Sequence, residues 1–170
     1  QSHLFTLSSS NTLALLPQYL DDMMSGWEIS DSTFINVKGL AFELGGGRRN
    51  RVLRNTLRNV SGPGVSLDTR GLGWEKAMCG TLATRVTELL YPGSPWASQY
   101  PELRNITTDA PCAPAWCEVV DNRYASDSVK NFLASSSPSS WPSWHVTVAN
   151  NTPSLKTDDA TARTVKCKQK

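Results

Sequence analysis

Short apolar groups separated by turn residues run through the first half of the chain. Between Ile29 and Leu44 the apolar residues form three groups, each too short for a helix, with Asn, Ser, Gly or Asp between them. Short apolar runs bounded by turn residues are typical of β-strands. The pattern therefore predicts three short strands in this part of the chain.

This pattern repeats after 23 residues. The sixteen-residue windows 29–44 and 52–67 are identical at five positions and exchange one apolar residue for another at three more. A fixed period of about 20–50 residues indicates stacked units that cannot bury their apolar faces alone. With three strands in each unit, the repeat predicts a parallel β-solenoid with one rung over 27–47 and the next over 50–70.

Other segments fit the same stack. Residues 19–20 predict the last strand of a preceding rung, and residues 119–124 match 52–57 at one common offset, which predicts a fourth rung. We expect residues 132–133 to close this rung, and the alternation over 144–148 predicts an edge strand. The asparagine pairs in equivalent positions predict stacked ladders inside the solenoid, Asn36 with Asn59 and Asn55 with Asn122.

Residues 71–117 interrupt the period. Apolar residues recur at helical spacing over 75–90, which predicts a short amphipathic helix that ends before Pro92. The rest of this insertion is rich in proline and aromatic residues. A long ordered insertion of this kind is typical of a lid or a binding loop.

Three segments of the sequence resemble those of a known family. They are LDD with SG at 20–26, GGGRRN at 45–50 and DTRGLGW at 68–74. On these segments the chain resembles the right-handed parallel β-helix repeat proteins, and closely a largely uncharacterised group with LDD…SG, GGGRxN and DxRGxxW motifs. The resemblance covers roughly residues 19–120.

The resemblance implies an all-β fold, a right-handed parallel β-helix of about four rungs with a helix-containing insertion. We expect residues 1–170 to form a single domain, which may be the C-terminal part of a longer β-helix, and to act as a monomer. The resemblance also implies company with enzymes that act on polysaccharides, as hydrolases or lyases. That implication is an analogy between folds rather than between sites.

Composition narrows the range of partners. The formal net charge is +2 and 19% of the 170 residues are charged, so no electrostatic field favours nucleic acid or a membrane surface. The longest apolar run is far too short to span a bilayer, so no membrane span is expected.

Sequons and cysteines predict a secreted, disulfide-bonded glycoprotein. Three Asn-X-Ser/Thr sequons begin at Asn59, Asn105 and Asn150. An even number of cysteines suits two disulfides, and of the three possible pairings we expect Cys112–Cys117 with Cys79–Cys167. The alternative is that the sequons arise by chance and that the thiols are free.

The repeat also brings acidic residues together. Leu20, Leu44 and Leu67 share one column, and the next column holds Asp21, Gly45 and Asp68. Because rungs stack at about 4.8 Å, the two carboxylates are expected about 9–10 Å apart, with a residue lacking a side chain between them. The two columns that follow are Asp22, Gly46 and Thr69, and then Met23, Gly47 and Arg70.

This arrangement predicts a glycine shelf on which a sugar ring can approach the backbone. The carboxylate separation lies at the wide end of the range for an inverting acid/base pair. The candidate catalytic residues are Asp21, Asp68 and Arg70, with Arg70 holding one aspartate ionised. The candidate substrate-binding residues are Asp22, Gly45, Gly46, Gly47, Arg48 and Trp74, with Arg49, Trp96 and Tyr100 nearby.

Alternative interpretations remain open. The glycines may serve turns that need positive φ, the aspartates may accept turn N–H groups, and Arg70 may simply pair with Asp68. No cofactor is expected, although Asp21, Asp22 and Asp68 are suitable oxygen ligands for Ca²⁺ in a calcium-assisted lyase. His145 is a further acid/base candidate. The alternative function is a non-catalytic extracellular structural or adhesion module.

Overall fold

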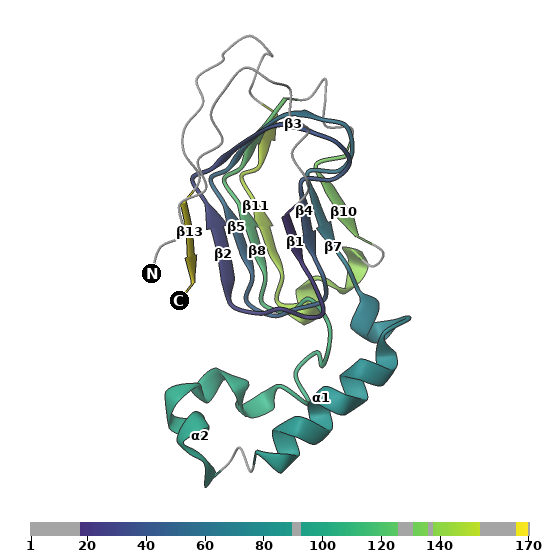
Figure 1. The fold of residues 1–170 in the computed structure, drawn as a ribbon, viewed down its shortest axis with the longest axis vertical. Helices are drawn as coiled ribbons and strands as arrows, with labels where there is room; N and C mark the ends of the chain where they lie inside the picture. Colours follow the sequence, from purple (N-terminus) through teal and green to yellow (C-terminus); the bar gives the residue numbers. More distant parts are fainter. Residues whose placement is uncertain (1–17, 90–92, 126–130, 136–137, 154–165, 170) are drawn as a thin grey trace.

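The structure is a computed structural model, and it describes residues 18–89, 93–125, 131–135, 138–153 and 166–169 (Figure 1). Within these residues the chain is mostly β, with two α-helices in one long connection. The elements, in chain order, are β1 Gln18–Leu20, β2 Trp27–Ser30, β3 Thr33–Val37, β4 Phe42–Leu44, β5 Arg51–Leu53, β6 Thr56–Val60, β7 Val65–Leu67, η1 Arg70–Leu72, α1 Lys76–Glu88, α2 Pro95–Gln99, η3 Pro101–Asn105, β8 Glu118–Val120, β9 Arg123–Tyr124, β10 Leu133–Ser135, η4 Pro138–Ser140, η5 Pro142–Trp144, β11 Thr147–Ala149, β12 Thr152–Pro153 and β13 Lys166–Gln169.

Consecutive strands belong to three different sheets. Their orders are β1-β4-β7-β10, β12-β9-β6-β3 and β11-β8-β5-β2-β13, and every pair is parallel except β13 with β2. The chain visits the sheets in the same order on each passage, so strands far apart in sequence lie side by side (Figure 1). We call this assembly the β stack and each passage through it a circuit. Because β13 pairs with β2, it covers an edge that would otherwise offer unpaired backbone groups.

The strand register confirms the repeat. Phe34 lies beside Leu57 in the β3–β6 pair and Phe42 lies beside Val65 in the β4–β7 pair, each 23 residues away. The expected leucine column is also present, with Leu44 paired to Leu20 on one side and to Leu67 on the other. The predicted fourth rung is present too, since β8, β9 and β10 pair with β5, β6 and β7.

The interior of the β stack is apolar, with one ladder of buried amides. Leu44, Val60 and Val119 are among the side chains with no exposed surface. The side-chain oxygen of Asn55 accepts the backbone N–H of Ser32 at 3.1 Å, and that of Asn122 accepts the backbone N–H of Asn55 at 2.9 Å. The predicted ladder is therefore confirmed, and it satisfies polar groups that the turns would leave buried without partners.

The insertion leaves the β stack after β7 and returns at β8. Figure 1 shows α1 and α2 extending away from one end of the strands. The predicted helix is confirmed with slightly narrower bounds, 76–88 rather than 75–90. None of its residues is buried, so α1 lies on the surface of the molecule rather than in its core.

The disulfide prediction was wrong. Cys79 on α1 bonds to Cys112, which excludes both expected pairs. Cys117 is instead a free thiol, fully buried beside the start of β8, and burial raises its pKa to about 11. The path of the insertion explains the difference, because it brings Cys112 against α1 while Cys117 points into the core.

The predicted edge strand over 144–148 was displaced. Residues 142–144 form the 3-10 turn η5, and the strand that pairs with β8 is β11, three residues later than expected. His145 consequently lies in the turn before the strand, in the left-handed region at φ 56°. Among the described residues, no helix has the length and apolar character needed to cross a membrane.

Candidate functional site

Arg70 organises the residues that the sequence singled out. The turn η1 begins at this residue immediately after β7, and it directs the side chain back across the adjoining strands. The guanidinium donates to Asp68 through Nε at 2.8 Å, to Asp21 through Nη1 at 2.5 Å and to the Tyr19 hydroxyl through Nη2 at 2.6 Å. Only 3% of the Arg70 side chain is exposed. We call this group the Arg70 cluster.

Two further carboxylates surround the same cation. Asp22 Oδ1 lies 3.8 Å and Glu75 Oε1 lies 3.9 Å from Arg70 Nη1. The side chain of Glu75 is nine-tenths buried, and its Oε2 has no hydrogen-bond partner. Sequence reasoning missed Glu75 and Tyr19, although both flank the motifs that were chosen.

The glycine shelf is real, but Arg70 covers it. A Cβ atom on Gly45 would lie 2.5 Å from the Leu20 carbonyl oxygen and 3.1 Å from Arg70 Cζ. A Cβ atom on Gly47 would lie 1.8 Å from the Met24 carbonyl oxygen, and Gly46 has φ +81°. All three glycines therefore serve close backbone approach or a left-handed turn, as the alternative interpretation held.

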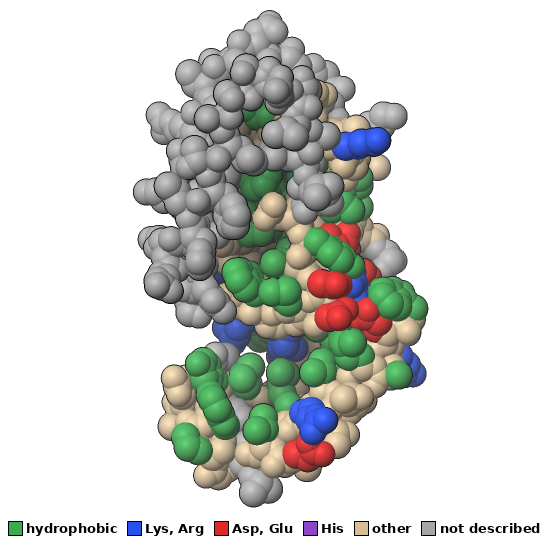
Figure 2. Space-filling view, in the orientation of Figure 1, with side chains coloured by type: hydrophobic (Ala, Val, Ile, Leu, Met, Phe, Trp, Pro, Cys, Tyr) green, Lys and Arg blue, Asp and Glu red, His purple; other side chains and the backbone are tan. Residues whose placement is uncertain are grey.

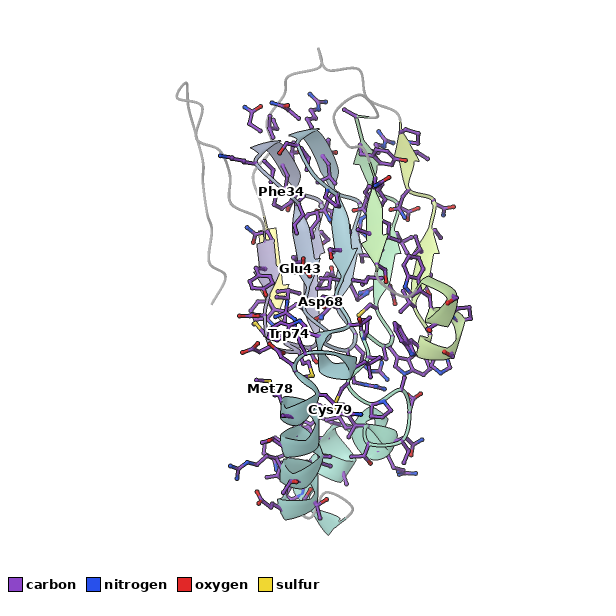
Figure 3. The ribbon with its side chains drawn as sticks, turned by 90° about the vertical axis from the view of Figure 1, so that its right-hand side faces the viewer. Phe34, Glu43, Asp68, Trp74, Met78 and Cys79 are labelled. Carbon is purple, nitrogen blue, oxygen red and sulfur yellow. A yellow bond between two sulfur atoms is a disulfide. The ribbon has the colours of Figure 1, made fainter. Side chains whose placement is uncertain are left out.

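Aromatic rings flank the cluster. Arg70 Cζ lies 5.1 Å from the Tyr19 ring centroid and 5.4 Å from that of Trp74, within the range of cation–π attraction. Tyr19 is 50% exposed and Trp74 is 74% exposed. Glu43, Asp68 and Trp74 follow one another down one side of the molecule toward α1 (Figure 3). In Figure 2 acidic side chains gather beside hydrophobic ones where the β stack meets α1.

The carboxyl groups of this surface differ in their proton affinity. Burial raises the pKa of Asp21, but the Tyr19 hydroxyl, the Asp22 N–H and Arg70 lower it further, so the net pKa is below the ordinary value. Burial is the main cause that raises the pKa of Glu75, and the charge of Asp22 adds to it. Burial likewise raises the pKa of Glu43, with help from Asp68. Ionised and proton-holding carboxyl groups therefore coexist around Arg70.

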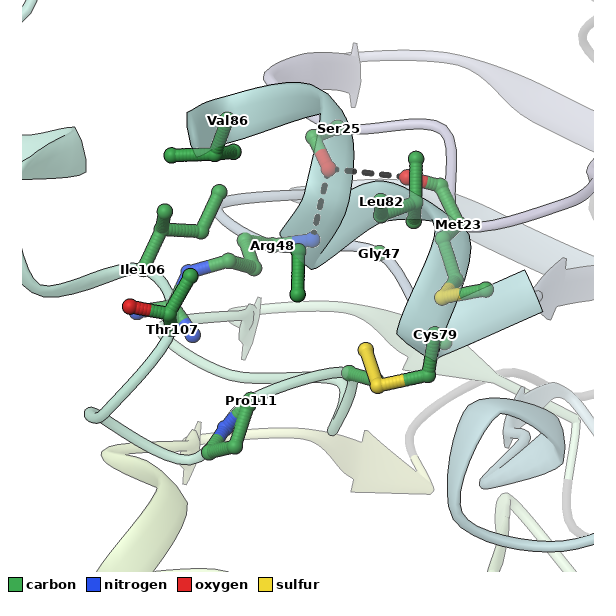
Figure 4. A pocket seen from close by; sticks show the side chains of 13 residues that line it. Met23, Ser25, Gly47, Arg48, Cys79, Leu82, Val86, Ile106, Thr107 and Pro111 are labelled. Carbon is green, nitrogen blue, oxygen red and sulfur yellow. Dashed lines mark hydrogen bonds between the residues drawn. A yellow bond between two sulfur atoms is a disulfide. The ribbon is translucent and has the colours of Figure 1, made fainter. Parts of the chain in front are cut away.

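Arg48 lies inside the molecule rather than at an open rim. It is 8% exposed and pairs with Asp109 at 2.8 Å. Together with Gly46 and Gly47 it lines a small, mainly apolar cavity of about 100 Å³ beside α1 and the Cys79–Cys112 disulfide (Figure 4). A cavity of this size is too small for a sugar ring. Trp96 and Tyr100 stack on each other at 6.0 Å, within α2 and the turn that follows.

The acidic residues do not fit a calcium site. The carboxylates of Asp21, Asp22 and Asp68 converge on the guanidinium of Arg70, which occupies the place a cation would need. In the described part of the chain, no group of three His, Cys, Asp or Glu side chains could hold a metal ion.

Comparison with known proteins gives no guide to identity. No protein-family model, curated protein or solved structure matches the chain. The argument for function therefore depends on the residues and contacts described above.

Proposed function

We propose that this protein is a right-handed parallel β-helix that binds a polysaccharide outside the cell, at the surface around the Arg70 cluster. Three parallel sheets visited in turn, at a register of 23 residues, support the fold. The Cys79–Cys112 disulfide supports an oxidising compartment.

The observation that carries the proposal is a pair of exposed aromatic rings held by one buried cation. Arg70 contacts the faces of Tyr19 and Trp74, and its own position is fixed by Asp21 and Asp68. Exposed rings normally lose rotamer freedom on binding, so rings that are already held reduce this cost. Nearby carboxylate oxygens are acceptors for sugar hydroxyl groups. A ring surface beside such acceptors suits a polysaccharide.

The same contacts favour binding over catalysis by the expected pair. An inverting pair needs a water molecule between its carboxyl groups and one protonated member. Here the guanidinium lies between Asp21 and Asp68, and both groups accept its hydrogen bonds. Arg70 is also a poor lyase base. Burial lowers its pKa, but Tyr19 and Asp68 raise it by more, so the side chain keeps its proton.

One observation favours hydrolysis as a second candidate function. Glu75 has a raised pKa and a buried oxygen without a partner, beside Asp22 and close to Asp21, whose pKa is lowered. Carboxyl groups whose environments separate their pKa values are the usual acid and base of glycosidases. In this case Glu75 is the acid, rather than either aspartate of the expected pair.

Replacing the most exposed ring tests the proposal. We expect Trp74→Ala to weaken binding to the preferred member of a panel of neutral and acidic polysaccharides by at least about tenfold, or 1.4 kcal/mol. The melting temperature should hardly move, because the ring is 74% exposed. Trp96→Ala is the matched control, since Trp96 is also exposed but stacks on Tyr100, away from Arg70.

Equal affinity of Trp74→Ala and the unchanged protein would overturn the binding proposal. An assay for new reducing ends on the same panel decides between the two functions. Turnover that Glu75→Gln abolishes supports the hydrolase, whereas binding without turnover supports the binding protein.

A further inference from the structure

A second surface lies at another corner of the β stack. Arg49, Trp116 and His145 each lie three residues before a paired position of β5, β8 and β11, so they occupy one corner in three successive circuits. All three are left-handed, with φ of 57°, 58° and 56°. We call them the Arg49 column.

The side chains of the column stack on one another outside the β stack. The rings of Trp116 and His145 are 4.0 Å apart at an interplanar angle of 19°. Arg49 Cζ lies 5.6 Å from the Trp116 ring centroid. Since His145 and Arg49 both contact the indole, this tryptophan is less suited than Trp74 to stack on a sugar.

A polar hollow of about 360 Å³ opens beside this column. Arg49 and Trp116 line one side, and residues of the insertion around η3 line the other. The volume lies within the range of small-ligand sites, about 300–1,000 Å³. The residues that line it are Arg49, Pro101, Arg104, Asn105, Asp109 and Trp116.

Charge in the hollow is unbalanced in favour of cations. Its acidic member, Asp109, already accepts from Trp116 Nε1 at 2.7 Å and from Arg48 at 2.8 Å, and it lies 3.5 Å from His145 Nε2. The indole N–H, followed by Arg48, lowers the pKa of this carboxyl, so it stays ionised and engaged. Arg49 and Arg104 are exposed, and among the side chains that the structure describes neither has an ion-pair partner.

We propose that this hollow binds the carboxylate or sulfate group of an acidic saccharide. Two unpaired guanidinium groups on facing walls match an anion with several acceptor oxygens, because a guanidinium donates in a planar fork. That the ligand is a saccharide rests on the proposed function, but the site is distinct from the Arg70 cluster. The hollow thus narrows the class of polysaccharide to an acidic one.

The test compares three oligosaccharides of equal length, one with uronate carboxylates, one sulfated and one neutral. Binding is measured by calorimetry and by the NMR signal of the Trp116 indole N–H, which Trp116→Phe identifies. The variants are Arg49→Gln, Arg104→Gln and Trp74→Ala, with Arg85→Gln as the control at an exposed site on α1. A host that adds no N-glycans is used, because Asn105 begins a sequon and lines the hollow.

We expect an acidic oligosaccharide to bind at least tenfold more tightly than the neutral one. Arg49→Gln and Arg104→Gln should each remove about tenfold of that preference, as expected for a charge-assisted hydrogen bond. Arg85→Gln should remove none, and Trp74→Ala should weaken all oligosaccharides alike. The better of the two acidic ligands identifies the anion.

Equal binding of neutral and acidic oligosaccharides, unchanged by Arg104→Gln, overturns this inference and leaves the proposed function standing. Suppose instead that no oligosaccharide binds, while inorganic sulfate still shifts the Trp116 signal in the unchanged protein but not in Arg104→Gln. The anion site is then supported and the proposed function fails.

Discussion

Two arginine sites at different corners of the same β stack differ in how their charge is balanced. Arg70 is buried and shares its donors among Asp21, Asp68 and Tyr19, with two more carboxylates within 4 Å. Arg49 and Arg104 are exposed, and the nearby carboxylate of Asp109 is engaged by other donors. The first cation is committed to the fold, whereas the other two are available to a ligand.

The comparison separates structural from functional charge. A buried cation whose donors are all used holds segments together, so its removal should cost stability. An exposed cation without a partner adds little to stability, so its removal should cost only binding. The residue that stands out in the sequence motif, Arg70, is therefore the supporting one. Its value to function lies in the rings and carboxyl groups that it holds.

Arg70→Met has the largest expected effect. It leaves Asp21, Asp68 and Tyr19 without their shared donor and places like charges together. We expect a loss of about 3 kcal/mol in the free energy of unfolding, at the low end for a broken buried ion pair because the aspartates are partly exposed. Denaturant unfolding measures it. Arg104→Met is the control and should change stability by less than about 0.5 kcal/mol.

A loss below about 1 kcal/mol for Arg70→Met, equal to that of the control, would remove the distinction between the two sites.

Gly45→Ala tests whether Arg70 is seated on the glycine shelf. The new methyl group would meet the Leu20 carbonyl and the Arg70 guanidinium, so we expect a loss of about 2 kcal/mol from overpacking. Gly80→Ala is a control of opposite sign. Nothing lies within 4 Å of its Cβ position on α1, and alanine there should stabilise the helix by about 0.5–1 kcal/mol.

Both unfolding free energies come from the same denaturant series. A neutral Gly45→Ala would mean that the guanidinium does not lie against the shelf, and the surface would then be open to a ligand.

Much of the β stack could be predicted from the sequence because its contacts repeat. The 23-residue offset alone placed Leu20, Leu44 and Leu67 in one column and predicted the Asn55–Asn122 ladder. It also brought Asp21 and Asp68 to either side of Gly45. The offset says nothing about side-chain direction, and so it did not predict that Arg70 turns back from η1 to cover the glycine.

The rest depended on segments outside the repeat. The partner of Cys79 is decided by the path of the insertion, which no periodicity describes. The Arg49 column did leave a signal. Trp116 and His145 are 29 residues apart, as are Asn122 and Asn151, whose side chains are hydrogen bonded. Extending the ladder by that shorter offset would have placed His145 at a corner instead of on a strand.

The smallest expected effect concerns the protons of the Arg70 cluster. The lowered pKa of Asp21 adds stability that is present above its ordinary value of 3.8 and is lost as the pH falls through the lowered value. The raised pKa of Glu75 adds stability that is present below its ordinary value of 4.5 and is lost as the pH rises through the raised value. The two carboxyl groups should therefore show opposite pH dependence.

Asp21→Asn and Glu75→Gln measure this dependence and control each other. Relative to the unchanged protein, Asp21→Asn should become less stable as the pH rises from 3 to 8, because the asparagine cannot gain the charge that Arg70 stabilises. Glu75→Gln should become more stable over the same range, because it cannot acquire the charge that burial penalises. Unfolding free energies at five or six pH values give both slopes. Slopes of the same sign would mean that Arg70 does not hold the two groups in different proton states, and the acid role considered for Glu75 would lose its support.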